Sequence, residues 1–312
     1  MKHFIDFHRD VSIEELDRLL TLATELKEKT KKGIPHPLLL GKTLGMIFSK
    51  SSTRTRVAFE VGMYQLGGQA LFLSANDIQL GRGETICDTA QVLSRMIDGI
   101  MIRTFSHKDV EDLAKFGTIP VINGLTDDQH PTQALADLLT IKEHKGSLKG
   151  LKLGYVGDGN NMAHSLIQAC AKAGMHIVVA SPKSYTCSDF FVRQGKTDAA
   201  ITGGSVFLTE DPVEAAKEAD VLYTDTWISM GQEEEKANRI AVFQKYQVNA
   251  ELMSHAKKDA IFLHCLPAYR GLEVAEDVID SPHSVVFDEA ENRLHAHKAI
   301  LVHCLSDSIF ET

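Results

Sequence analysis

Six consecutive residues, from Ser51 to Arg56, combine hydroxyl and guanidinium groups directly after an apolar run that ends at Phe48. The segment reads Ser-Ser-Thr-Arg-Thr-Arg, and we expect a strand to end there and a helix to begin. A helix N-terminus offers unpaired N–H groups and a favourable dipole to an anion. Hydroxyls add short donors, and an arginine fork holds a phosphate bidentately. The segment therefore predicts a phosphate site, although a capped helix with a solvated basic turn has the same sequence.

Four further polar residues stand where predicted strands end or the next helix begins. They are Arg103, His130, Asp225 and Cys265. Ligands of doubly wound α/β domains bind beyond the carboxyl ends of the strands, so we expect these side chains to line one crevice between two domains. Taken alone, Arg103 could simply extend to solvent and His130 could simply start a helix.

Two loops in the second half of the chain suit a zwitterionic ligand. The first reads Gly-Asp-Gly-Asn-Asn-Met from Gly157, and Met162 replaces the third glycine of a dinucleotide fingerprint, so NAD binding is not predicted. Its polar side chains include Asn161. The second reads Asp-Thr-Trp-Ile-Ser-Met-Gly from Asp225, where a carboxylate can hold an ammonium group and Ser229 can hold a carboxylate or an amine.

The cysteines and histidines predict neither a metal site nor a disulfide framework. The five cysteines are far apart and form no CxxC pair, which is typical of a reducing cytoplasm. His264 and Cys265 are adjacent on a predicted strand, so their side chains should point to opposite faces and should not form a nucleophilic dyad.

The composition narrows the classes of protein. A chain of 312 residues with 44% apolar and 24% charged residues suits two globular domains. Its net charge of −9 argues against nucleic acid or acidic lipid as a partner. No apolar run has the length of a membrane span, and the N-terminus lacks the apolar core of a signal peptide. We therefore expect a cytoplasmic location.

Strand-like and helix-like segments alternate along the chain, which predicts α/β architecture with two doubly wound parallel-sheet domains and the active site in the cleft between them. A capping box at Ser12 opens the first helix. The expected domains are residues 1–147 with the C-terminal helix of about 290–312, and residues 148–289. The expected strands are 43–48, 70–73, 99–102, 120–122, 151–156, 176–180, 221–224, 261–264 and 285–287. The later helices are expected at 54–66, 85–96, 108–116, 132–144, 163–173, 213–218 and about 289–306.

Together these motifs resemble those of the aspartate/ornithine carbamoyltransferase family. The resemblance rests on the segments 52–56, 130–133 and 264–267 and on Arg103, and it extends over nearly the whole chain, including residues 286–293. The segment 225–231 is similar to the ornithine-binding loop of that family. The loop 81–85, Gly-Arg-Gly-Glu-Thr, is similar to the aspartate branch.

The resemblance implies that carbamoyl phosphate and L-ornithine give L-citrulline and phosphate through a tetrahedral intermediate, without a cofactor. Catalytic roles would fall to Arg103, His130, Asp225 and Cys265. Ornithine would be held by Asn161, Asp225, Ser229 and Met230. Carbamoyl phosphate would be held by Ser52, Thr53, Arg54, Thr55, Gln79, Arg103, His130, Gln133, Cys265, Leu266 and Arg293.

The same resemblance implies a homotrimer in which Gln79 reaches across a subunit boundary. Arg56 is expected to point away from the ligand, into a structural ion pair, because it lies two residues beyond Arg54 on a helix. Two alternatives remain open. One is a carbamoyltransferase for another acceptor, aspartate or putrescine. The other is a binding or regulatory protein without chemistry, which should have lost Arg54, Arg103, His130 or Cys265, yet all four are present.

Overall fold

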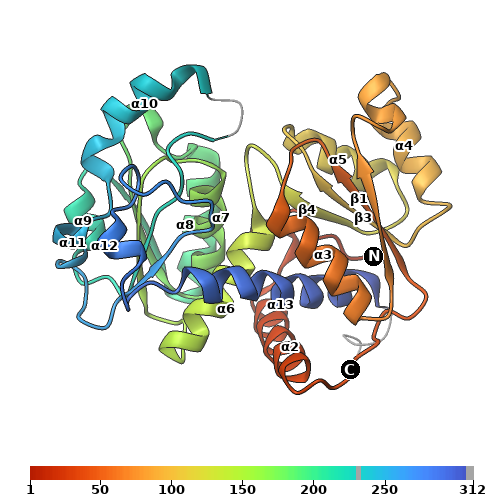
Figure 1. Cartoon of the computed structure of the whole chain (residues 1–312), viewed down its shortest axis with the longest axis horizontal. Helices are drawn as coiled ribbons and strands as arrows, with labels where there is room; N and C mark the ends of the chain where they lie inside the picture. Colours follow the sequence, from red (N-terminus) through yellow and green to blue (C-terminus); the bar gives the residue numbers. More distant parts are fainter. Residues whose placement is uncertain (230–232, 307–312) are drawn as a thin grey trace. The chain divides into compact units, whose positions relative to one another are not determined.

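The computed structural model describes residues 1–229 and 233–306 and divides the chain into two compact units (Figure 1). Unit 1 comprises Met1–Leu139 and the chain from Glu291 onward, and unit 2 comprises Thr140–Ala290. The chain passes from one unit to the other inside two helices, α6 (Pro131–Lys145) and α13 (Val286–Leu305). None of the helices within the described residues is long and apolar enough to cross a membrane.

Unit 1 contains a four-stranded parallel sheet in the order β2-β1-β3-β4. Its strands are β1 (Thr43–Phe48), β2 (Gln69–Ser74), β3 (Gly99–Arg103) and β4 (Val121–Leu125). Its other helices are α1 (Phe7–Asp10), α2 (Ile13–Lys31), α3 (Thr53–Gln65), the 3-10 turn η1 (Gln79–Arg82), α4 (Ile86–Leu93) and α5 (His107–Phe116). The strands β1, β3 and β4 are buried almost throughout, as expected where helices cover both faces of a parallel sheet, whereas the edge strand β2 is largely exposed.

The alternation of side chains along β3 shows which helices cover each face of this sheet. Ile100 and Ile102 pack in one cluster with Val110 and Leu113 of α5. Gly99 faces the other way, where a Cβ atom would collide with Leu305 of α13. The helix α13 therefore approaches the sheet so closely that β3 has to begin with a residue without a side chain.

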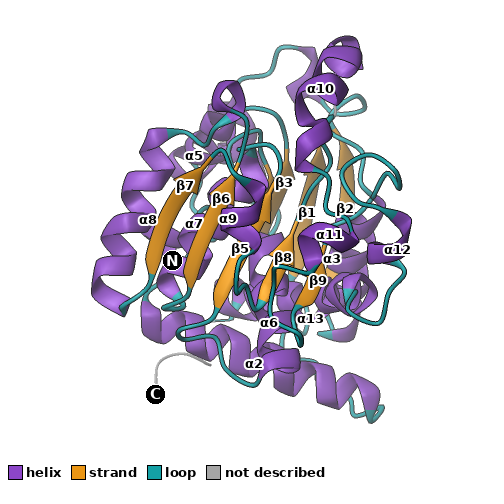
Figure 2. Ribbon diagram, turned by 90° about the vertical axis from the view of Figure 1, so that its left-hand side faces the viewer, coloured by secondary structure: helices purple, strands orange, loops and turns teal. Residues whose placement is uncertain are grey.

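Unit 2 contains a five-stranded parallel sheet in the order β7-β6-β5-β8-β9, which can be followed across Figure 2. The strands are β5 (Lys152–Val156), β6 (His176–Ala180), β7 (Ser205–Thr209), β8 (Val221–Tyr223) and β9 (Ile261–Leu263). The helices are α7 (Asn161–Lys172), α8 (Asp189–Thr202), α9 (Pro212–Ala216), α10 (Lys236–Phe243), α11 (Ala250–Met253) and α12 (Glu276–Ile279), with 3-10 turns η2 (Lys183–Tyr185), η3 (Glu233–Glu235) and η4 (Gln244–Tyr246). The helices α7 and α8 pack against each other, and α9 contacts β5, β6 and β7.

Most expected elements are confirmed, and the errors have local causes. The capping box at Ser12 is present, with both of its hydrogen bonds. The expected strand at 285–287 is wrong, because these apolar residues lead into α13, which begins at Val286. The helices α1, α8, α10, α11 and α12 and the strand β7 were not predicted. The strand β7 is short and has a mixed, partly exposed pattern, so its periodicity is weak.

Candidate active site

The N-terminus of α3 presents the Ser-Ser-Thr-Arg-Thr-Arg segment at the end of β1. Ser52 is the N-cap residue, and its hydroxyl accepts a hydrogen bond from the Thr55 N–H at 3.2 Å. Thr53 is exposed and Arg54 is half-buried, so both side chains can meet a ligand at the helix start. Arg56 instead pairs with Glu60 one turn along the helix, at 3.0 Å, which confirms the expected structural ion pair.

Thr55, Gln133 and Arg293 form a buried hydrogen-bonded group that joins three helices. Arg293 of α13 donates to the Thr55 hydroxyl at 2.8 Å and to the side-chain oxygen of Gln133 on α6. Gln133 in turn donates to Asp137, one turn along α6, at 2.8 Å. Because the Thr55 oxygen accepts from Arg293, its own O–H remains a donor for another group. The planar guanidinium holds α3, α6 and α13 in one arrangement.

Arg103 and His130 lie beside this group, at the ends of β3 and before α6. Both are more than nine-tenths buried. The backbone of Arg103 accepts a hydrogen bond from the Ser49 N–H at 2.8 Å, which ties it to the loop that follows β1. Burial lowers the pKa of His130 well below its usual value, and the positive charges of Arg293, Arg103 and Arg54 lower it further. The imidazole is therefore a neutral hydrogen-bond donor surrounded by cations.

Four buried histidines of unit 1 make its stability depend on pH. Burial lowers the pKa of His295 and of His303 to about 4, and it lowers the pKa values of His130 and His297 well below the usual value. Below about pH 6.5 the unfolded chain binds more protons than the folded chain, so stability that is complete above this pH is lost as the pH falls. Each histidine should reduce the free energy of unfolding by up to about 1.4 kcal/mol per pH unit.

Urea unfolding between about pH 7.5 and about pH 5 measures this loss. In the variant His303→Gln, the free energy of unfolding should change less steeply with pH, by the contribution of about one proton. A free energy of unfolding that stays constant over this range, in the unmodified chain, would contradict the prediction.

Lys50 contacts residues of the loops that follow β3 and β4, and the sequence did not predict this role. It is buried, forms an ion pair with Asp127, and lies 4.3 Å from the centre of the Phe105 ring. It thereby connects the loop after β1 with those after β3 and β4. A lysine beside two serines has the pattern of a solvated turn, so only its burial reveals this role.

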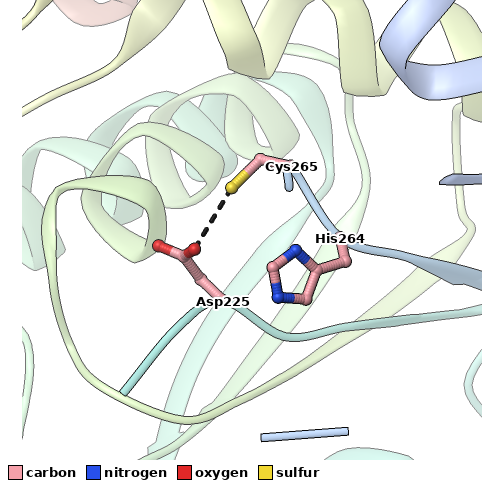
Figure 3. A group of neighbouring side chains, drawn as sticks. All are labelled: Asp225, His264 and Cys265. Atoms are coloured by element: carbon pink, nitrogen blue, oxygen red, sulfur yellow. Dashed lines mark hydrogen bonds between the residues drawn. The ribbon is translucent and has the colours of Figure 1, made fainter. Parts of the chain in front are cut away.

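Asp225 and Cys265 form the polar centre of unit 2 (Figure 3). The Cys265 thiol donates to one carboxylate oxygen of Asp225 at 3.2 Å, and the same oxygen accepts from the Thr226 N–H at 2.7 Å. The other oxygen accepts from the Asn160 amide at 2.8 Å. Asp225 follows β8 and is buried, so a carboxylate with three donors stands at the carboxyl end of the sheet.

Asn160, the residue before Asn161, contacts Asp225 through its side-chain amide. Asn160 is the N-cap residue of α7, and its side-chain oxygen also accepts from the N–H groups of Met162 and Ala163. The sequence pattern of two adjacent asparagines offered no way to tell the cap from its neighbour. Asn161 is half-buried at the start of α7.

The expectation that His264 and Cys265 point to opposite faces is wrong. The strand β9 ends at Leu263, so strand alternation does not apply to them. The ring of His264, the Cys265 sulfur and the Asp225 carboxylate lie within 4.8 Å of one another, a spacing that a metal ion could use (Figure 3). Both ring nitrogens are already engaged, because Nδ1 accepts from the Leu266 N–H and Nε2 lies 3.1 Å from Glu273. A metal ion would have to displace one of these partners.

The loop that follows Asp225 is anchored by a buried arginine. Arg239 of α10 donates to the backbone oxygen of Trp227 and forms an ion pair with Asp158, in the loop after β5. Ser229 lies between Trp227 and Arg239 in the sequence and is half-buried. Met230 lies outside the described residues. In unit 1, Gln79 is exposed at the start of η1.

Fold and site together define a two-unit α/β protein in which the first unit gathers arginines at a helix start and the second unit carries a buried carboxylate at the end of a strand. Residues 2–143 match the family described as aspartate/ornithine carbamoyltransferase, carbamoyl-P binding domain. Residues 149–304 match the description aspartate/ornithine carbamoyltransferase, Asp/Orn binding domain.

Similar proteins extend over nearly the whole chain. The ornithine carbamoyltransferase of Carboxydothermus hydrogenoformans is 62% identical over 292 residues, which cover 94% of each chain. That of Bacillus subtilis is 61% identical over 94% of this chain and 91% of its own. The structure of ornithine carbamoyltransferase from Pyrococcus furiosus superposes with a TM-score of 0.95 at 56% identity, covering 99% of this chain and 98% of that chain. The chain belongs to the aspartate/ornithine carbamoyltransferase family, and it is a carbamoyltransferase.

Proposed function

We propose that this chain transfers the carbamoyl group of carbamoyl phosphate to the δ-amine of L-ornithine, giving L-citrulline and phosphate. The observation that carries the proposal is the buried group of Thr55, Gln133 and Arg293 beside the neutral His130, at a helix start that presents Arg54. The relatives that are 58–62% identical are named ornithine carbamoyltransferases, which supports the predicted acceptor.

Unit 1 binds carbamoyl phosphate in this proposal. The α3 start, with Ser52, Thr53, Arg54 and Thr55, holds the phosphate through its hydroxyls, its N–H groups and one guanidinium. The carbonyl oxygen of the carbamoyl group accepts from Arg103, Thr55 and His130. Gln133 and Arg293 complete the part of the site that unit 1 supplies. The other proposed ligands of carbamoyl phosphate are Gln79 of the neighbouring subunit, and Cys265 and the backbone of Leu266 from unit 2.

Unit 2 binds ornithine. The proposed ligands are Asn161, Asp225, Ser229 and Met230, with Asp225 and Cys265 nearest the δ-amine. Asp225 alone favours the ammonium form, which cannot attack a carbonyl carbon. The cations that hold carbamoyl phosphate oppose this preference, because a positive potential favours loss of the ammonium proton.

The reaction then needs one nucleophilic displacement. The lone pair of the neutral δ-nitrogen forms a bond to the carbamoyl carbon, and the carbonyl π electrons move to oxygen. The resulting oxyanion is stabilised by Arg103, Thr55 and His130. When the C–O bond to phosphate breaks, that electron pair leaves with phosphate and the amine proton is released. Holding both reactants in register supplies up to about 7–11 kcal/mol of the barrier reduction.

We also propose that the active enzyme is a cytoplasmic homotrimer in which Gln79 of one subunit reaches the carbamoyl phosphate of the next. Exposed apolar side chains on α3 and β2, two elements that contact each other, support a subunit interface on this part of unit 1. They are Val57, Tyr64, Leu71 and Phe72. Sedimentation equilibrium should give three times the mass of the chain. A monomer that retains full activity would contradict this assembly.

Acceptor competition tests the proposed function. Citrulline formation from ornithine should proceed, and aspartate or putrescine in excess should neither react nor inhibit at comparable concentrations. Carbamoylaspartate or carbamoylputrescine as the main product would assign the enzyme to another acceptor. Binding of carbamoyl phosphate without any transfer would favour a protein that has the fold but no chemistry.

A further inference from the structure

His264 lies next to Cys265 (Figure 3). It is fully buried, and the proposed reaction gives it no role. Its Nδ1 accepts a hydrogen bond from the Leu266 N–H at 2.9 Å, and its Nε2 lies 3.1 Å from Glu273 Oε1. A nitrogen that accepts a hydrogen bond carries no proton, so the proton of the neutral ring is on Nε2 and is donated to Glu273. The two contacts thus define both the tautomer and the orientation of the ring.

The backbone that His264 holds has an unusual conformation. Leu266 has a φ angle of +57°, in the left-handed region that residues with a side chain rarely adopt. Such a conformation persists where surrounding contacts impose it, and it is found preferentially at ligand-binding positions. The Leu266 N–H bond to His264 is a contact of this kind. The N–H of His264 itself donates to Glu289 at 2.8 Å, so the chain is held on both sides of Cys265.

Two buried glutamates hold this histidine in turn. Glu273 is fully buried, and the oxygen that faces His264 also accepts from the Tyr269 N–H at 2.6 Å. Glu289 is fully buried as well, and its other oxygen accepts from the Tyr223 hydroxyl at 3.2 Å. Burying a carboxyl group is costly, and this cost is only partly offset at Glu273, whose Oε2 has no hydrogen-bond partner within the described residues. Both are placed where they hold the segment 264–269.

We propose that His264 is a positioning residue, which holds the Leu266 backbone in the conformation that contacts carbamoyl phosphate. It acts through Leu266 and does not touch the substrate. The inference rests on the proposed function, in which Leu266 is part of the carbamoyl phosphate site. It assigns to Glu273 the task of orienting the ring.

Two substitutions at one position test the inference. His264→Leu removes the acceptor for the Leu266 N–H, so we expect the KM for carbamoyl phosphate to rise about tenfold or more and kcat to fall about tenfold. His264→Asn places its amide oxygen near the position of Nδ1, so it should recover most of both constants. The contact with Glu273 is lost in both variants, and only the contact with Leu266 separates them.

His164→Leu is the matched control. His164 is also a buried histidine of unit 2 whose ring accepts a backbone hydrogen bond, from the Ser188 N–H at 3.0 Å. This variant should lower the unfolding midpoint but leave the KM for carbamoyl phosphate within about twofold.

The inference is overturned if His264→Leu has wild-type constants, or if His264→Asn is as impaired as His264→Leu. Where His264→Leu does not fold, the KM of His264→Asn decides, and a tenfold rise in this variant counts against the inference. A wild-type chain that forms no citrulline would refute the proposed function instead, so the two failures are distinguishable.

Discussion

Replacing Arg54 with Gly is expected to reduce kcat/KM for carbamoyl phosphate about a thousandfold, measured as citrulline formed at saturating ornithine. Arg54 is the second residue of α3, where the helix dipole and the free N–H groups already favour an anion. Its charge acts on the same region as those of Arg103 and Arg293, since all three lower the pKa of His130. A doubly charged phosphate would lose a bidentate partner that neither hydroxyls nor N–H groups replace.

Arg56→Gly is the control for Arg54→Gly. Both changes place glycine in the first turns of α3, so both carry the same helix-propensity cost of about 1 kcal/mol. Arg56 is exposed, pairs with Glu60, and lies with its guanidinium 3.7 Å from the centre of the Phe72 ring. We expect its kinetic constants to change less than about twofold, because exposed ion pairs contribute little. Near-normal constants for Arg54→Gly, or equal losses in both variants, would refute the phosphate site.

Replacing Asp225 with Asn is expected to raise the KM for ornithine about 10–100-fold and to leave the KM for carbamoyl phosphate nearly unchanged. The substitution removes the negative charge that would face the ornithine ammonium. It also places an NH₂ group among donors, because one carboxylate oxygen accepts from Cys265 and Thr226 and the other from Asn160. One of these contacts must therefore be lost in either orientation of the amide.

Asp220→Asn is the control for Asp225→Asn. Asp220 is also a buried aspartate next to β8, but it lies at the amino end of the strand. It pairs with Lys257 at 2.7 Å and accepts from the Lys152 N–H at 2.8 Å. Its substitution should lower the unfolding midpoint without raising the KM for ornithine. An equal rise in both variants would mean that the effect of Asp225→Asn comes from destabilised packing.

Local patterns predicted many of the features that depend on neighbours in sequence. The buried strands β1, β3 and β5 were predicted because they are continuous apolar runs between turn residues. The start of α3 was predicted because Ser52 supplies a cap and Arg54 follows it. The same reasoning was wrong at 285–287, where three apolar residues suit a strand and a helix start equally well.

Contacts between distant segments could not be read from such patterns. Thr55 and Arg293 are 238 residues apart, and they meet because α13 returns to pack on α3 and the sheet of unit 1. Asp225 and Asn160 are 65 residues apart, and they meet because the N-cap residue of α7 lies beside the end of β8. The sequence by itself was therefore enough to predict the parallel α/β class and the positions of charged residues at the strand ends, because the patterns of strands and helices are short-range. The tertiary structure decided which of these groups form hydrogen bonds or ion pairs with one another. The reason is that packing within each unit brings remote side chains within about 3 Å.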